Sequence, residues 1–289
     1  MKGIVLAGGT GSRLWPLTFG MSKQLLPVYD KPMIYYPIST LMLAGIREIL
    51  LITTEKDQSQ FKSLLGDGSK FGISLQYEIQ KEPRGLAQAL TIGKEFLGGA
   101  GCLLILGDNI FHGVGLGQEL RRSIPTRGAH IFTYAVSNPE EYGVLALSED
   151  GSPLSIEEKP KNPKSNLAIT GLYFFDSRAP EYAALVNPSH RGELEITSVL
   201  QAYLDNDELT VTNLSRGTAW LDTGTVDALH DASAYIRVIE QRTGLKIGCL
   251  EEIAHAMHWI SPSEIQKNFS SYKNGYGKYL LSIVGEEFE

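Results

Sequence analysis

The sequence contains few cysteines and no long apolar run. Only two cysteines, Cys102 and Cys249, occur among 289 residues, which is too few for a disulfide scaffold in a chain of this length. We therefore expect two buried free thiols in a reducing compartment. No apolar run approaches the ~20 residues that a membrane-spanning helix needs, and Gly8 and Gly9 interrupt the first apolar run, unlike a signal peptide. We expect a cytoplasmic protein that does not span a membrane.

Positive charge is also scarce. The chain has 26 lysines and arginines against 33 aspartates and glutamates, so its formal net charge is −7. An acidic balance argues against a protein whose affinity depends on neutralising a nucleic-acid backbone. A small nucleotide can still bind through a few local cations.

Two familiar glycine-rich motifs are absent from the N-terminal segment GIVLAGGTGSRLWPLT. A leucine stands where the dinucleotide fingerprint has its third glycine, and no Gly-Lys-Ser/Thr follows as in a P-loop. What is present is an apolar strand followed by Gly8, Gly9 and Gly11, and then Arg13. Such glycines let several backbone N–H groups converge on an anion, and the guanidinium adds a planar fork of donors. The segment predicts a phosphate-binding loop of another kind.

Short apolar runs alternate with helical patterns through the first half of the chain. Strands are predicted at KGIVLA, ILLITT, ISLQYEI and CLLILGD, with helices opened by Pro32 and near residues 57–65 and 85–97. This alternation is typical of βαβ units in an α/β protein with a mainly parallel sheet. Because ligands bind beyond the carboxyl ends of such strands, the glycine loop and Asp108 are expected on one rim.

The second half is more mixed. Strands are predicted at IFTYAV, LSIEEK, AITGLYFFD, LTVTNL and TAWLDT, and helices near residues 195–205 and 224–242. After Gly244 the pattern changes to short helices broken by glycine and Ser-Pro. We therefore expect an α/β domain over residues 1–243 and a helical segment packed on it over residues 244–289.

Several motifs together resemble the sugar-nucleotide pyrophosphorylases. The N-terminal GGTGSRLWPLT and SKQLLPVYDKPMIYYPI resemble the opening of that family. Further agreements follow in the family's order: QKEPRGLAQAL, LGDNIF, EEYGV, SIEEKP, ITGLYFFD, RGELEIT and AWLDTGT. The resemblance implies a Rossmann-like, mixed and mainly parallel central sheet flanked by helices, with a C-terminal helical appendage.

The resemblance also implies a reaction. The phosphate of α-D-glucose 1-phosphate would attack the α-phosphorus of dTTP in line, giving dTDP-glucose and pyrophosphate with Mg²⁺. It further implies a homotetramer and feedback by a dTDP-sugar near the C-terminal helices. A UTP- or CTP-dependent relative, a non-catalytic nucleotide-sugar sensor and a nicotinamide-dependent oxidoreductase are the alternatives, and the missing third glycine disfavours the last.

Four residues are the predicted catalytic groups. Arg13 is expected to hold the triphosphate and Lys23 to neutralise an adjacent phosphate, although Lys23 could be a solvated surface charge. Asp108 and Asp222 each end an apolar run, where an unpaired carboxylate is unfavourable. Two such carboxylates suit a Mg²⁺ completed by phosphate oxygens and water, although each alone is also a common turn or N-cap residue. The resemblance assigns the metal to this pair.

The remaining assignments follow the resemblance. For the base, Gln80 offers a donor and an acceptor, Gly85 lets its backbone approach and Leu86 adds apolar contact, while Arg84 departs from the family pattern. The implied nucleotide-binding residues are Gly8, Gly9, Thr10, Gly11, Ser12, Arg13, Gln80, Pro83, Gly85 and Leu86.

The sugar phosphate is assigned to the second half of the chain. Lys159 and Arg191 are expected to hold its phosphate. Since adjacent strand residues point to opposite faces, Glu158 and Lys159 can share a site only at a bulge or strand end. The implied sugar-phosphate residues are Asn109, Tyr142, Gly143, Glu158, Lys159, Thr170, Gly171, Tyr173 and Arg191.

Overall fold

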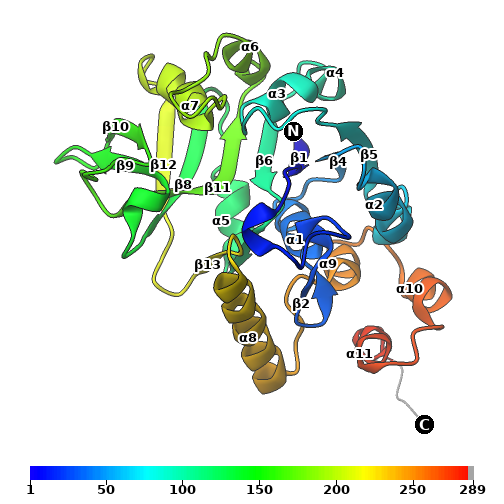
Figure 1. The fold of residues 1–289 in the computed structure, drawn as a ribbon. Coiled ribbons are helices and arrows are strands. Elements are labelled where there is room, and N and C mark those ends of the chain that lie inside the picture. The colour runs from blue at the N-terminus through cyan, green and yellow to red at the C-terminus, as the bar shows by residue number, and fades with distance from the viewer. Residues whose placement is uncertain (286–289) are drawn as a thin grey trace.

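A nine-stranded sheet runs through the part of the chain that the computed structural model describes, residues 1–285 (Figure 1). Four neighbouring strands form its parallel part, with β1 between β6 and β4, and β5 at the edge. Their bounds are β1 (Lys2–Ala7), β4 (Glu48–Thr53), β5 (Ser74–Ile79) and β6 (Cys102–Leu106). The four strands predicted in the first half of the chain are therefore confirmed.

The other half of the sheet is built around the long strand β11 (Leu167–Phe175), which pairs antiparallel with β6, β8 and β9. Strand β12 is parallel to β8, and β10 is antiparallel to β9. Within the sheet, only β11 and β10 run against the other strands, which confirms a mixed, mainly parallel sheet. The remaining strands are β8 (Ala129–Ala135), β9 (Gly143–Leu147), β10 (Pro153–Glu158) and β12 (Leu209–Asn213).

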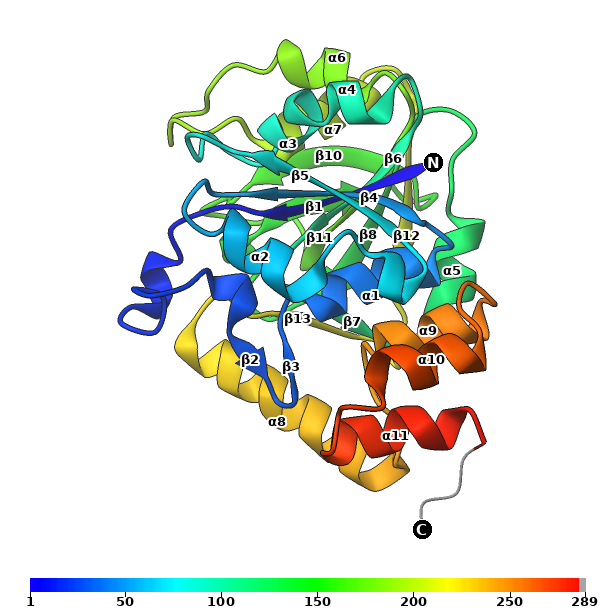
Figure 2. The same ribbon diagram turned by 90° about the vertical axis from the view of Figure 1, so that its right-hand side faces the viewer.

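Helices cover both faces of this sheet (Figure 2). The adjacent residues Ile4 and Val5 of β1 belong to different core clusters, because successive strand side chains point to opposite faces. On the face of Ile4 lie α3 (Gln88–Ile92), α4 (Lys94–Leu97), α6 (Ala179–Ala184) and α7 (Ile196–Leu204). On the face of Val5 lie α1 (Tyr35–Leu43), α2 (Gln58–Leu65), α5 (Leu116–Arg122), α9 (Leu250–Ala256), α10 (Pro262–Phe269) and α11 (Gly275–Ile283).

A smaller apolar cluster lies below the sheet. It joins the long helix α8 (Val226–Thr243) to the hairpin of β2 (Pro27–Val28) and β3 (Lys31–Pro32). A separate two-stranded ribbon, formed by β7 (Asn109–His112) and β13 (Ala219–Asp222), supplies Ile110 to the same cluster. Short 3₁₀ turns occupy Ser12–Leu14, Lys23–Leu25, Ser69–Phe71 and Pro139–Glu141.

Two details of the predicted elements are wrong. Pro32 does not open a helix, because it lies in β3, where the following N–H of Met33 donates to the carbonyl of Leu26 and closes the hairpin. The helix begins instead at Tyr35. The helix predicted near residues 85–97 is divided at Gly93 into α3 and α4, and a Cβ at Gly93 would lie 2.7 Å from Ile4 Cδ1 of the sheet.

The C-terminal helices share the main core. Helix α8 ends at Thr243, followed by Gly244 in a left-handed conformation. Leu250 of α9 and Ile265 of α10 lie in the same cluster as Val5 of the sheet, while the division between residues 243 and 244 stays a prediction. Cys102 and Cys249 are buried and free, as expected. Among residues 1–285 no helix combines the length and apolarity that crossing a bilayer requires.

Candidate functional site

The glycine-rich loop follows the carboxyl end of β1. Gly9 and Gly11 have φ of 101° and 60°, in the left-handed region that side chains disfavour. Gly8 is close to another segment, because a Cβ there would lie 2.3 Å from Gln80 Oε1. The loop then enters the 3₁₀ turn that carries Arg13.

This loop forms one wall of a polar hollow of about 390 Å³. Lys23 lies across from the glycines, and Asp108 comes from the carboxyl end of β6. Most of the predicted phosphate-binding residues therefore meet in one place. The lining is Gly8, Gly9, Thr10, Gly11, Ser12, Arg13, Leu14, Lys23, Gln24, Pro83, Asp108, Glu193 and Gly224.

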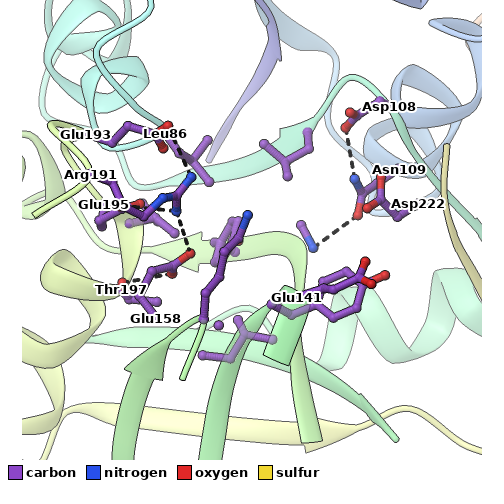
Figure 3. A pocket seen from close by; sticks show the side chains of 18 of the residues that line it. Leu86, Asp108, Asn109, Glu141, Glu158, Arg191, Glu193, Glu195, Thr197 and Asp222 are labelled. Carbon is purple, nitrogen blue, oxygen red and sulfur yellow. Dashed lines mark hydrogen bonds and ion pairs between the residues drawn. The ribbon is translucent and has the colours of Figure 1, made fainter. Parts of the chain in front are cut away.

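A second cavity of about 230 Å³ adjoins the first (Figure 3). Arg13, Asp108 and Glu193 line both cavities, so these residues stand at their junction. The other lining residues are Leu86, Leu106, Asn109, Glu141, Tyr142, Gly143, Glu158, Lys159, Ile169, Gly171, Tyr173, Arg191, Glu195, Ile196, Thr197, Trp220 and Asp222.

Asp108 has a cation as its partner, as its position after a buried strand predicts. Lys23 Nζ lies 2.6 Å from Asp108 Oδ2, and only 8% of the lysine side chain is exposed. Burial disfavours ionised Asp108, but the charge and the hydrogen bond of Lys23 outweigh it and hold the pKa of Asp108 below its usual range. Asp108 is therefore ionised at neutral pH.

Asp222 reaches the same cavity from β13. Burial, followed by repulsion from Asp108, raises the pKa of Asp222, although Lys23 and Arg13 act in the opposite direction. The ribbon explains this proximity, because its register places Asp222 opposite Asn109, the residue after Asp108. Two carboxylates that repel one another are an environment in which a divalent cation is favoured.

The side-chain amide of Asn109 already has hydrogen-bond partners within the protein. Its Nδ2 donates to Asp108 Oδ1 at 3.0 Å, and its Oδ1 accepts from Trp220 Nε1 at 2.6 Å. The N–H of Gly171 donates to the same oxygen at 3.3 Å. The side chain that the resemblance assigns to the sugar therefore orients Asp108 and Trp220.

Arg191 lies among three carboxylates, on the side of the second cavity opposite Asp108 and Asp222 (Figure 3). Its guanidinium is 3.4 Å from Glu158, 3.2 Å from Glu193 and 3.4 Å from Glu195. Burial and the nearby Glu195 raise the pKa of Glu158. Strand β10 ends at Glu158, and Lys159 has φ of 43°, so both residues line the cavity at a strand end, as predicted.

Three of the predicted residues do not line either cavity. Thr170 is fully buried, and its hydroxyl donates to the carbonyl of Phe132 at 3.0 Å. Gln80 and Gly85 lie behind the lining, where Gln80 Nε2 is 3.4 Å from the carbonyl of Gly85. Thr170 therefore supports the sheet, while Gln80 remains next to Gly8 of the loop.

Sequence reasoning missed several lining residues. Trp220 stands in the motif AWLDTGT, directly before the predicted acid, and its ring packs at 5.1 Å against that of Tyr142. The motif RGELEIT contains Glu193, Glu195 and Thr197, which all line the second cavity. The sequence predicts a binding role only for its arginine. The signal was in the motifs, but which side chains face the cavity depends on the fold.

Comparisons with known proteins identify the family. A family model described as nucleotidyl transferase matches residues 2–238. The glucose-1-phosphate thymidylyltransferase of Xanthomonas campestris pv. campestris (strain B100) is 54% identical over 285 residues, covering 98% of this chain and 97% of the relative. That of Mycolicibacterium smegmatis is 54% identical over 288 residues, covering 99% and 100%.

Solved structures show the same fold. A structure described as a glucose-1-phosphate thymidylyltransferase from Bacillus anthracis in complex with sucrose has a TM-score of 0.75 and 41% identity, covering 82% of this chain and 95% of the other. A UDP-glucose pyrophosphorylase complexed with UDP-glucose has a TM-score of 0.73 at 23% identity, covering 82% and 98%, which is a likeness of fold. With a family model over residues 2–238 and relatives that span nearly its whole length, the chain belongs to the nucleotidyl transferase family.

Proposed function

We propose that this chain transfers the thymidylyl group of dTTP to α-D-glucose 1-phosphate, with release of pyrophosphate. The observation that carries the proposal is the pair of adjoining cavities with Arg13, Asp108 and Glu193 at their junction. One cavity has the glycine loop and a lysine, which suit a triphosphate. The other has hydroxyl, amide and carboxylate groups with three cations, Arg13, Lys159 and Arg191, which suit a sugar phosphate. The reacting oxygen and phosphorus would meet between them.

The protein's main task in such a transfer is alignment. Two polyanions must be held in line for attack on the α-phosphorus, and the charge that develops between them must be offset in advance. Arg13 would hold the triphosphate and the departing pyrophosphate. Lys23 would neutralise a neighbouring phosphate, and Lys159 with Arg191 would hold the phosphate of the sugar.

Asp108 and Asp222 are the residues that would hold Mg²⁺. They fit such an ion, since burial and Asp108 together raise the pKa of Asp222 and a cation between them would relieve that repulsion. When bound, the ion would offset negative charge on the phosphate oxygens. Among residues 1–285 no group of three or more acidic, histidine or cysteine side chains forms a cage, which agrees with an ion completed by substrate and water.

The sugar would lie beside Tyr142, Gly143, Glu158 and Tyr173, with Trp220 over the same cavity. Carboxylate and hydroxyl groups accept and donate to sugar hydroxyls, and aromatic faces pack on the sugar ring. Binding energy from these remote contacts would hold the phosphate of the sugar at the attacking position.

The base would lie near Gln80, Gly85 and Leu86. Thymine differs from uracil by one methyl group, and a methyl contact discriminates by about 1 to 3 kcal/mol. We therefore expect some activity with UTP. A UTP- or CTP-dependent enzyme and a non-catalytic sensor are the competing functions.

A pyrophosphate-release assay tests the proposal. The purified protein is mixed with Mg²⁺, one of dTTP, UTP, dCTP or ATP, and one of several hexose 1-phosphates. The expected result is the fastest release with dTTP and glucose 1-phosphate. Fastest release with another triphosphate would favour the competing enzyme, and no release with any pair would favour the sensor.

The resemblance to the family further leads us to propose a homotetramer with feedback by a dTDP-sugar. A third cavity of about 450 Å³ lies between α1, α5, β7 and α9, and its lining includes His112, Arg121, Lys246 and Glu252. Arg121 and Lys246 are the cations of this lining, and they suit a diphosphate. Sedimentation velocity tests the assembly, and inhibition of pyrophosphate release by a dTDP-sugar tests the feedback.

A further inference from the structure

We propose that Gln88, at the start of α3, is a positioning residue that selects the base by fixing the direction of the Gln80 amide. It does so from behind Gln80, without touching the nucleotide. The proposal rests on the proposed function, and it names the class of base that the site accepts: one with an N–H at the centre of its pairing edge.

The hydrogen bonds around the two glutamines can run in only one direction. The backbone N–H of Arg84 can only donate; it is shared between the carbonyl of Glu82 at 2.9 Å and Gln88 Oε1 at 3.3 Å. The same oxygen lies 2.8 Å from Gln80 Nε2, which must therefore be the donor. Gln80 Nε2 also lies 3.4 Å from the carbonyl oxygen of Gly85, which can only accept. A main-chain donor at one end and a main-chain acceptor at the other thus assign both amides.

The consequence is a fixed acceptor beside the glycine loop. With Nε2 engaged, Gln80 turns Oε1 toward Gly8, where an added Cβ would lie 2.3 Å from that oxygen. Within residues 1–285, Oε1 has no hydrogen-bond partner, although Gln80 is only 6% exposed. Water or a ligand can donate to this oxygen, so it is an available acceptor at the edge of the hollow. Since Gly8 lines the polar hollow, the oxygen lies next to the expected nucleotide.

The direction of this amide decides which pyrimidine fits. Thymine and uracil carry a hydrogen on N3, which donates to an acceptor, whereas cytosine has a lone pair at N3. An unrestrained glutamine could rotate its amide and serve either base. Rotation of Gln80 would place its oxygen against Gln88 Oε1 and the Gly85 carbonyl, and oxygens at these distances repel one another. Gln88 therefore makes the site an acceptor for N3–H.

The test compares three variants with the wild type. Gln88→Met has a similar volume but cannot accept from Gln80, Gln88→Glu keeps an accepting oxygen, and Gln60→Leu on α2 is the matched control away from the site. The measurement is kcat/KM for dTTP and for dCTP, each with glucose 1-phosphate. A site with a directed hydrogen bond discriminates by about 100-fold or more, so we expect at least that ratio in the wild type.

Gln88→Met should lower the dTTP-to-dCTP ratio by about tenfold or more, because the 2.8 Å bond is lost and only the longer contact of 3.4 Å with the Gly85 carbonyl then holds the direction of the Gln80 amide. Gln88→Glu and Gln60→Leu should keep the ratio within about threefold of the wild type. A wild-type ratio in Gln88→Met, or an equal loss in Gln88→Glu, would overturn the proposal. If a thermal unfolding measurement shows that Gln88→Met is not folded, Gln88→Ala takes its place.

The proposed function can fail separately. If the wild type releases no pyrophosphate with either triphosphate, the proposed function is wrong. The role of Gln88 is then tested by measuring the binding of dTTP and of dCTP with titration calorimetry. A preference for dTTP binding that is lost in Gln88→Met and kept in Gln88→Glu supports the role of Gln88. Equal binding of both nucleotides by the wild type refutes it.

Discussion

At the scale of single residues, the pKa values of the two aspartates of the site are shifted in opposite directions. Lys23 outweighs the effect of burial and holds the pKa of Asp108 below its usual range. Burial and the charge of Asp108 raise the pKa of Asp222. By linkage, ionised Asp108 stabilises the fold at neutral pH while ionised Asp222 destabilises it. The two carboxylates therefore repel one another at the point where we place Mg²⁺.

The substitution Asp222→Asn separates activity from stability. We expect pyrophosphate release to fall by about 100-fold or more, because one of the two carboxylates for the metal is lost. The Tm at pH 7 should rise. A raised pKa means that the folded chain binds the proton more tightly than the unfolded chain, so above that pKa the ionised group destabilises the fold. Parallel rate and thermal-unfolding measurements check this, and near-normal turnover would exclude the metal role.

The substitution Asp108→Asn should give the same loss of turnover with the opposite change in stability. It leaves the buried Lys23 without its carboxylate, which we expect to lower the free energy of unfolding by about 2 kcal/mol at pH 7. The contribution of Asp108 is present above its unfolded pKa and is lost as the pH falls through its lowered folded pKa. Urea unfolding at pH 7 and at strongly acidic pH measures the difference, and Tm shifts of the same sign in both aspartate variants would contradict this account.

At the scale of elements, the ribbon of β7 and β13 carries both acids. Thr223, directly after Asp222, binds the carbonyl of Asp108 twice, through its hydroxyl at 2.8 Å and its N–H at 3.2 Å. It is completely buried. The end of β13 is therefore tied to the residue that precedes β7, and the spacing of the two carboxylates follows from this contact.

The substitution Thr223→Val tests that link. Loss of the hydroxyl should weaken the hold on the Asp108 carbonyl by about 1 kcal/mol, so we expect the Mg²⁺ concentration for half-maximal activity to rise about fivefold. Thr223→Ser keeps the hydroxyl and should restore the wild-type value. The Mg²⁺ dependence of pyrophosphate release is the measurement. A fall in Tm without any change in Mg²⁺ dependence would mean that Thr223 is only structural.

The sequence predicted the features that depend on local signals. Apolar runs located the strands, and glycines with Arg13 located the loop, because strand ends of a parallel sheet share one rim. Contacts between distant segments cannot be predicted from such local signals. Asn109 occurs within a motif, but its bond to Trp220 requires the ribbon to form. Pro32 predicts a helix start because proline favours a first helical turn, yet proline suits a strand of a short hairpin equally well.

At the scale of the whole molecule, a buried charge network joins three distant parts. Lys31 of β3 lies 2.9 Å from Glu240 of α8, with 2% and 4% of these side chains exposed. Lys246 binds Glu240 at 3.0 Å and also pairs with Asp30. The N–H of Ile247 donates to Glu240 at 2.9 Å. Glu240 therefore fastens together the hairpin of β2 and β3, the long helix α8 and the segment that leads into the C-terminal helices.

The substitution Glu240→Gln should therefore destabilise the whole fold rather than one helix. The amide still accepts from Ile247, but Lys31 loses a buried counter-charge, and we expect a loss of about 3 kcal/mol in the free energy of unfolding. Lys31 keeps its pair with Asp30. The double variant Lys31→Met/Glu240→Gln removes the buried lysine that has lost one of its two carboxylates, so it should be more stable than Glu240→Gln alone. Urea unfolding of both variants, followed by circular dichroism and by tryptophan fluorescence, measures the coupling. If the double variant were the less stable of the two, Lys31 would owe its place to packing and to Asp30, and the network would not hold these three parts together.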